Sequence, residues 1–310
     1  NNIIGFNYYS AKYELNRTFP RDITNYVPRI GYSAYNYLYL KLPYHIIGTL
    51  GFSYNYSDNE GEEDRFPKTG FFPKVGVLFD INNNTKFRFA YFRGLKNPIE
   101  SLQTIEPTQV SGFNQFFDDV SDRYFSFYGS ALDFIYKQNI FAGLEVTRRD
   151  IFNDSGGDLT LKKDTFKSYL NWTATDRLSI TALYKFVEDL KPEKNRKLST
   201  HSVLLDLRYF HPCGLFGRVA GTYINQSLFK HDDIFLDEQA ILINSKFILL
   251  DASIGYRLPN RNGIIAFEVR NLLDKKFSYE DLNTEQTNTF FNLSEFIPQR
   301  TLFGRITLNF

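Results

Sequence analysis

Charged side chains recur two residues apart, with an apolar residue between them, in several parts of the chain. Asp206 and Arg208 flank Leu207, and Asp251 and Arg257 alternate with apolar residues further on. A spacing of two places these side chains on one face of a β-strand and the apolar ones on the other face. Charges arranged in this way act on each other or on a passing solute.

Residues that could carry catalysis are few. His231 is followed by Asp232 and Asp233, but no nucleophile stands at a fixed spacing from this cluster. Cys213 is the only cysteine, so it predicts neither an intrachain disulfide nor a metal motif. The other histidines lie at predicted turns or near a strand end: His45, His201 and His211. We expect no enzymatic activity, no metal site and no cofactor.

The composition favours a β-structured membrane wall. The 310 residues are 43% hydrophobic and include 32 Phe and 21 Tyr, yet the mean hydropathy is −0.34. No stretch approaches the roughly 18 apolar residues that a transmembrane helix requires. A barrel that faces lipid on one side and a polar lumen on the other has this mixed composition. The net charge of +1 gives no reason to expect a nucleic acid partner.

Alternation with a period of two predicts fourteen strands, most of them long enough to cross a bilayer with the usual tilt. They are 3–15, 30–42, 45–56, 71–81, 85–93, 124–137, 139–149, 164–174, 177–187, 200–210, 215–227, 246–258, 263–273 and 299–310. A soluble β-sandwich or propeller is the alternative, but it would not explain the aromatic enrichment.

Short and long connections alternate between these strands. Tight turns are expected at 43–44, 82–84, 138–139, 175–177, 211–214 and 259–262. Longer polar connections are expected at 16–29, 57–70, 94–123, 150–163, 188–199, 228–245 and 274–298. This alternation predicts an all-β fold: a transmembrane, antiparallel, up-and-down barrel with short periplasmic turns and long extracellular loops. We expect residues 1–310 to form one such domain, either alone or as the C-terminal part of a longer protein.

The C-terminal region carries a first family resemblance. Residues 300–310 alternate up to a terminal Phe310, which looks like the signal read by the barrel assembly machinery of the outer membrane. The sequence Val-Arg-Asn-Leu-Leu-Asp-Lys-Lys-Phe at 269–277, followed by Pro-Gln-Arg-Thr at 298–301, resembles the closing hairpin of TonB-dependent receptors. The resemblance covers about forty residues. That family combines a plug domain with a 22-stranded barrel, and neither fits in this chain.

A second resemblance covers the middle of the chain. Residues 90–95 and 103–119, which include Glu-Pro-Thr-Gln-Val-Ser-Gly-Phe-Asn-Gln-Phe-Phe, are similar to the C-terminal barrel of outer-membrane proteins with tetratricopeptide repeats. Residues 143–150 also match. This resemblance implies a location in the outer membrane of a Gram-negative-type bacterium and a role in saccharide export. A periplasmic domain or partner would feed such a barrel.

The polar face of the predicted strands gives a set of candidate pore-lining residues. They are Lys74, Asp80, Lys86, Arg88, Asp133, Lys137, Glu145, Arg149, Lys167, Lys185, Asp206, Arg208, Arg218, Asp251, Arg257, Glu268, Arg270 and Arg305. Basic residues outnumber acidic ones, and a ring of Arg or Lys favours anions. A lattice of ion pairs that stiffens the wall is an equally open interpretation. We expect polar or anionic solutes, or a saccharide polymer, to pass.

The connection 94–123 is long and unusually apolar, which is typical of a loop that packs or functions. We expect it to fold into the barrel mouth or lumen as a constriction. Its polar face would consist of Glu106, Gln109, Asn114, Gln115 and Asp118. The alternative is a packed extracellular cap.

Three further features leave alternatives open. The acidic segment 57–64 suits either a divalent cation or a solvated loop. Tyr35, Tyr37 and Tyr39 are expected to face inward, where they would contact sugars or fill space. The barrel is expected to contact outer-membrane lipid and lipopolysaccharide. Rival functions are an uptake receptor of the TonB-dependent type and a structural or adhesive barrel that acts through its loops.

Overall fold

The computed structural model describes residues 1–17, 23–59, 67–95, 106–117, 123–152, 159–231, 240–282 and 299–308. In this part of the chain, fourteen strands form one antiparallel sheet in which strands that follow one another along the chain are neighbours, with β1 and β16 at the two ends of the order. They are β1 (Asn2–Arg17), β2 (Ile23–Leu42), β3 (Ile46–Asn59), β4 (Lys68–Asn82), β5 (Thr85–Leu95), β8 (Tyr124–Tyr136), β9 (Ile140–Phe152), β10 (Leu159–Thr175), β11 (Leu178–Lys191), β12 (Arg196–Phe210), β13 (Leu215–His231), β14 (Ala240–Arg257), β15 (Gly263–Arg270) and β16 (Thr301–Leu308).

The remaining elements are short. A two-stranded sheet consists of β6 (Gln109–Val110) and β7 (Phe113–Asn114). Two 3-10 turns, η2 (Pro192–Lys194) and η3 (Pro259–Arg261), lie between strands. No helix in the described ranges has the length and apolar character needed to cross a membrane.

Each of the fourteen predicted segments contains a strand, and their order confirms the predicted up-and-down topology of a transmembrane β-barrel. The segment predicted at 263–273 is too long, because β15 ends at Arg270. Several strands extend further than predicted into the long connections that join them. β2 begins at Ile23 and β14 at Ala240, and the connection predicted at 188–199 reduces to η2 and Asn195. The apolar alternation stops where both faces become polar, but the backbone pairing continues beyond it.

The chain divides into two compact units. The first unit comprises residues 1–130 and 147–162, and the second comprises 131–146 and 163–310. In the first unit, β2 has Tyr35 and Tyr37 buried on one face and Leu42 exposed at 48% on the other. The tyrosines therefore face away from the leucines, as predicted.

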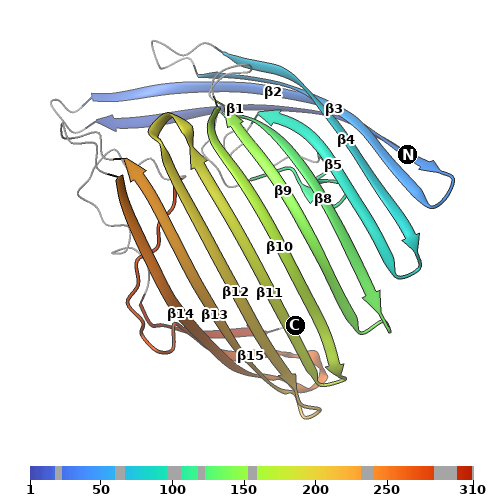
Figure 1. Ribbon diagram of the computed structural model, residues 1–310, viewed down its shortest axis with the longest axis vertical. Helices are drawn as coiled ribbons and strands as arrows, with labels where there is room; N and C mark the ends of the chain where they lie inside the picture. Colours follow the sequence, from blue (N-terminus) through green and yellow to red (C-terminus); the bar gives the residue numbers. More distant parts are fainter. Residues whose placement is uncertain are drawn as a thin grey trace. The chain divides into compact units, whose positions relative to one another are not determined.

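The second unit shows the same division, with β10 to β14 running side by side (Figure 1). On β12, Asp206 is 3% exposed, whereas Leu205 and Leu207 on the opposite face are 49% and 40% exposed. Large apolar side chains exposed along a whole face are typical of a wall in contact with lipid. We call the face of the sheet that exposes these large apolar side chains the apolar face, and the face that carries Asp206 the polar face.

Candidate functional site: the polar face and two segments docked on it

A small hairpin from the predicted constriction loop lies on the polar face of the first unit. Its strands β6 and β7 are joined by Ser111 and Gly112, which have φ angles of 47° and 82°. Two consecutive residues with positive φ form the turn that suits a tight hairpin, and glycine adopts such angles without strain. Val110 and Phe113, which flank the turn, are 0% and 3% exposed. The hairpin is therefore packed against the sheet.

Glycines in the sheet make room for the hairpin. A Cβ atom at Gly76 on β4 would lie 2.9 Å from Ser111 Cβ and 3.0 Å from Val110 Cγ1. A Cβ atom at Gly129 on β8 would lie 2.7 Å from Phe113 Cε1. Since real Cβ atoms do not approach so closely, only glycine allows this docking.

Replacing Gly76 with valine is expected to displace the hairpin while the sheet stays intact. The valine methyl groups would occupy the space of Ser111 and Val110. Protection of residues 109–114 from hydrogen exchange should fall, and that of β3 and β4 should not change. Unchanged protection of 109–114 would contradict the docking.

Aromatic and cationic side chains also hold the hairpin. The Phe117 ring lies 5.8 Å from the Phe127 ring on β8, and the Arg149 guanidinium lies 4.0 Å above the Phe117 ring. Arg88 on β5 lies 4.9 Å above the Phe113 ring. Each cation over a ring contributes about 0.5–2 kcal/mol, depending on its exposure.

A buried polar cluster, which we call the latch, joins the loop to the wall. It consists of Tyr37 on β2 and Lys74 on β4 with Glu106 and Gln115 from the loop. Lys74 Nζ lies 3.6 Å from Glu106 Oε1 and donates a hydrogen bond to Gln115 Oε1 at 2.6 Å. Tyr37 donates to Glu106 Oε1 at 2.6 Å and accepts from Gln115 Nε2 at 2.8 Å. All four side chains are at most 9% exposed.

The predicted constriction residues thus fall into two groups. Glu106 and Gln115 belong to the latch and face the wall. Gln109 and Asn114 are exposed on the hairpin. Asp118 lies outside the described residues, and so do Phe310 and most of the acidic segment 57–64.

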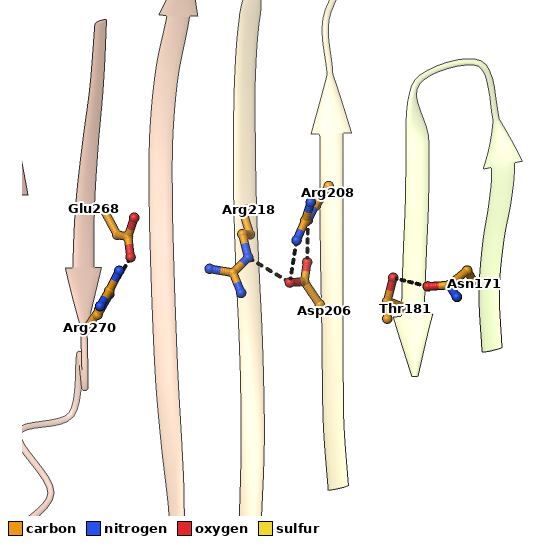
Figure 2. Close-up of polar contacts among 7 residues, drawn as sticks. All are labelled: Asn171, Thr181, Asp206, Arg208, Arg218, Glu268 and Arg270. Carbon is orange, nitrogen blue, oxygen red and sulfur yellow. Dashed lines mark hydrogen bonds and ion pairs between the residues drawn. The ribbon is translucent and has the colours of Figure 1, made fainter. Parts of the chain in front are cut away.

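Ion pairs connect several of the predicted charged residues on the polar face. In the second unit, Asp206 accepts hydrogen bonds from Arg208 Nε at 3.0 Å, Arg208 Nη2 at 3.2 Å and Arg218 Nε at 2.7 Å (Figure 2). Glu268 accepts one from Arg270 Nε at 2.7 Å in the same view. One carboxylate between two guanidinium groups leaves a local positive charge. Arg208 and Arg218 are 52% and 31% exposed, so this charge is accessible.

The other predicted charges can be placed from the strand alternation and their contacts. Lys86 lies 3.3 Å from Asp80, and Asp133 accepts a hydrogen bond from Tyr169. Asp251 accepts one from the backbone of Asn271. Further residues on the polar face, by alternation with these, are Glu145, Lys167, Lys185, Arg257 and Arg305. Lys137 is an exception: it lies in the turn after β8 with a φ of 49°, where the strand has already ended.

On the polar face, the sequence prediction missed the ion pair between Lys163 on β10 and Asp189 on β11, whose atoms lie 3.3 Å apart. Both residues lie just beyond the predicted strand ends. Continuing the alternation from Lys167 and Lys185 by four residues in each case would have found them. Because the pair adds one charge of each sign, it leaves the balance of the polar face unchanged.

A second docked segment, residues 271–282, was not expected from the sequence. Gln226 on β13 is 1% exposed and donates from Nε2 to the Glu280 carbonyl at 3.1 Å. Its Oε1 accepts from the Glu280 backbone N–H at 3.0 Å. Phe277 stacks on Phe247 of β14 with ring centres 4.3 Å apart, and Leu282 packs with Leu198 and Leu228. This segment, which comprises the predicted strand end 271–273 and the start of the predicted connection 274–298, therefore lies on the polar face of the second unit.

In the turn after β12, His211 Nδ1 lies 2.9 Å from Cys213 Sγ, and both side chains are exposed. His201 lies on the apolar face, where its Nδ1 is 2.9 Å from the Tyr184 hydroxyl. No group of three or more His, Cys, Asp or Glu side chains in the described ranges could hold a metal ion. The side chain of His231 lies outside the described residues.

Comparison with known proteins supports the fold but shows no family. No family model matches the sequence, and no curated protein matches it. The ferric enterobactin receptor PfeA of Pseudomonas aeruginosa matches over 100% of this chain and 59% of its own length, with a TM-score of 0.65 and 13% identity. The ferric-catecholate import receptor Fiu of E. coli K12 matches over 82% of this chain and 42% of its own length, with a TM-score of 0.53 and 14% identity.

A third match is the siderophore receptor PiuA of Acinetobacter baumannii, over 87% of this chain and 49% of its own length, with a TM-score of 0.50 and 11% identity. The chain thus spans about half the length of these solved structures. At such low identity the likeness concerns the fold alone. That fold agrees with the predicted location in an outer membrane. The chain has the fold of the outer-membrane β-barrels.

Proposed function

We propose that this chain forms the wall of a transport pathway for polar solutes across the outer membrane. The docked hairpin acts as a constriction in that pathway. The observation that carries the proposal is the latch, because burying the charges of Lys74 and Glu106 is costly unless they pair. A wall that served only as an anchor would not need a loop held on its polar face in this way.

The test is a planar-bilayer recording of the purified protein. The proposal expects discrete ion-conducting steps, and it expects these steps to become larger when residues 100–118 are replaced by a short glycine linker. A barrel that never conducts, with or without this loop, would contradict the proposal. No enzymatic activity is proposed, and the barrel is proposed to contact lipopolysaccharide in the outer leaflet. Phe310 remains the proposed assembly signal.

The exposed guanidinium groups beside Asp206 support a preference for anions. Replacing Asp206 with Asn should leave Arg208 and Arg218 without their carboxylate and raise the permeability of chloride relative to potassium. Replacing Arg218 with Gln should lower that ratio. The measurement is the reversal potential in a salt gradient. If both variants have the same ratio of chloride to potassium permeability as the unmodified protein, this cluster only stiffens the wall.

A second candidate function is the barrel of an uptake receptor. It is favoured by the likeness to three receptors that import siderophores or ferric catecholates, and by the resemblance of 269–277 to the closing hairpin of TonB-dependent receptors. Whole-cell uptake of a labelled ferric catecholate, with and without the gene, distinguishes the two. Loss of this uptake in the deletion strain would favour the receptor.

A further inference from the structure

The apolar face of the second unit contains a groove over the start of β13. Its volume is about 430 Å³, within the range of about 300–1,000 Å³ that is usual for ligand pockets. Apolar side chains from five neighbouring strands line it, among them Leu178, Leu207, Tyr209, Val219, Ile254 and Phe267. All six project from the side of the sheet opposite Asp206.

The groove exists because one residue has no side chain. Gly217 pairs directly with Tyr209 on one side and with Ile254 on the other, so two tall side chains flank it. A Cβ atom at Gly217 would meet only Ser253 O, at 3.7 Å, which is ordinary contact. The position therefore tolerates a side chain, and its glycine is not required by the backbone.

We propose that this groove binds one acyl chain of a phospholipid. The face that contains it exposes its large apolar residues, such as Val219 at 49% and Ile254 at 55%, as a wall in lipid does. The groove lies beside the short turns at 176–177 and 211–214, which the barrel fold places toward the periplasm. The leaflet on that side consists of phospholipid.

A basic group stands where the phosphate of such a lipid would lie. Arg177 precedes Leu178 of the groove, and its carbonyl accepts a hydrogen bond from the Phe210 N–H at 2.8 Å, which fixes this turn beside the end of β12. Its side chain is exposed, next to Asp176 in the same turn. Basic residues near the membrane surface are attracted to anionic lipid headgroups. The proposal does not depend on what the barrel transports.

The test is a titration of the detergent-solubilised protein with phosphatidylglycerol, followed by native mass spectrometry. Gly217→Leu fills the groove and should weaken binding of the first lipid by roughly tenfold, the equivalent of 1.4 kcal/mol. Gly221→Leu is the matched control, because Gly221 lies on the same strand and face and a Cβ there meets nothing within 4 Å. Arg177→Gln should weaken binding less than Gly217→Leu does.

Thermal unfolding followed by circular dichroism shows whether both leucine variants are folded. Equal lipid binding by Gly217→Leu and Gly221→Leu would overturn the proposal. So would a stronger loss of lipopolysaccharide than of phosphatidylglycerol in Gly217→Leu, because the groove would then belong to the outer leaflet.

Discussion

Replacing Glu106 with Gln is expected to release the β6–β7 hairpin and to raise the single-channel conductance toward that of the variant in which a glycine linker replaces residues 100–118. The substitution keeps the shape of the side chain but leaves the Lys74 ammonium buried without its carboxylate. Removing one partner of a buried ion pair costs roughly 3–5 kcal/mol. Undocking lets water reach Lys74, so the ratio of docked to undocked hairpin should fall by roughly 100-fold or more.

The control for this prediction is the double variant Lys74→Met, Glu106→Gln. Methionine fills a volume similar to that of the lysine chain, and no unpaired charge is left in the latch. The double variant should therefore conduct like the unmodified protein. If Glu106→Gln alone leaves conductance unchanged, the latch does not hold a constriction. If both variants conduct more than the unmodified protein and to the same extent, the loss of the Glu106 carboxylate as the acceptor for Tyr37, and not an unpaired charge on Lys74, explains the effect.

The strands could be predicted from the sequence because successive side chains alternate between an apolar and a polar environment. Leu205, Asp206 and Leu207 show this directly, with exposures of 49%, 3% and 40%. The strand ends could not be predicted in the same way. Residues such as Lys163 and Asp189 lie where both faces of the sheet are polar. There the sequence no longer alternates between apolar and polar residues, although the backbone pairing of the strands continues.

The docked segments show a different limit. The apolar content of 94–123 predicts that this loop packs, but nothing local indicates that Glu106 meets Lys74 or that Ser111 meets Gly76. These contacts join residues more than thirty positions apart, and they depend on which glycine lies opposite the hairpin. The segment 271–282 has 5 apolar residues in 12, against 9 in 30 for 94–123. Its docking nevertheless depends on Gln226, a polar residue that alternation alone assigns to an open wall.

Replacing Gln226 with Ala is expected to loosen the segment 271–282 from the polar face. The amide of Gln226 binds both the N–H and the carbonyl of Glu280, and it also donates to Thr200 at 3.0 Å. Leaving such buried groups without partners costs about 1–3 kcal/mol. Local opening should therefore become roughly tenfold more frequent or more. Trypsin cleavage after Lys275 and Lys276, measured under native conditions, should accelerate by the same factor.

Asn225→Ala is the matched control, because Asn225 is the neighbouring residue on the same strand and points to the opposite face. It should leave the cleavage rate unchanged. Leu282→Ala removes an apolar contact with Leu198 and Leu228, and it should accelerate cleavage without altering any of the hydrogen bonds of Gln226. If the segment narrows the pathway, Gln226→Ala and Leu282→Ala should both raise the conductance. Faster cleavage with unchanged conductance would assign the segment a structural role on the wall and leave the β6–β7 hairpin as the constriction.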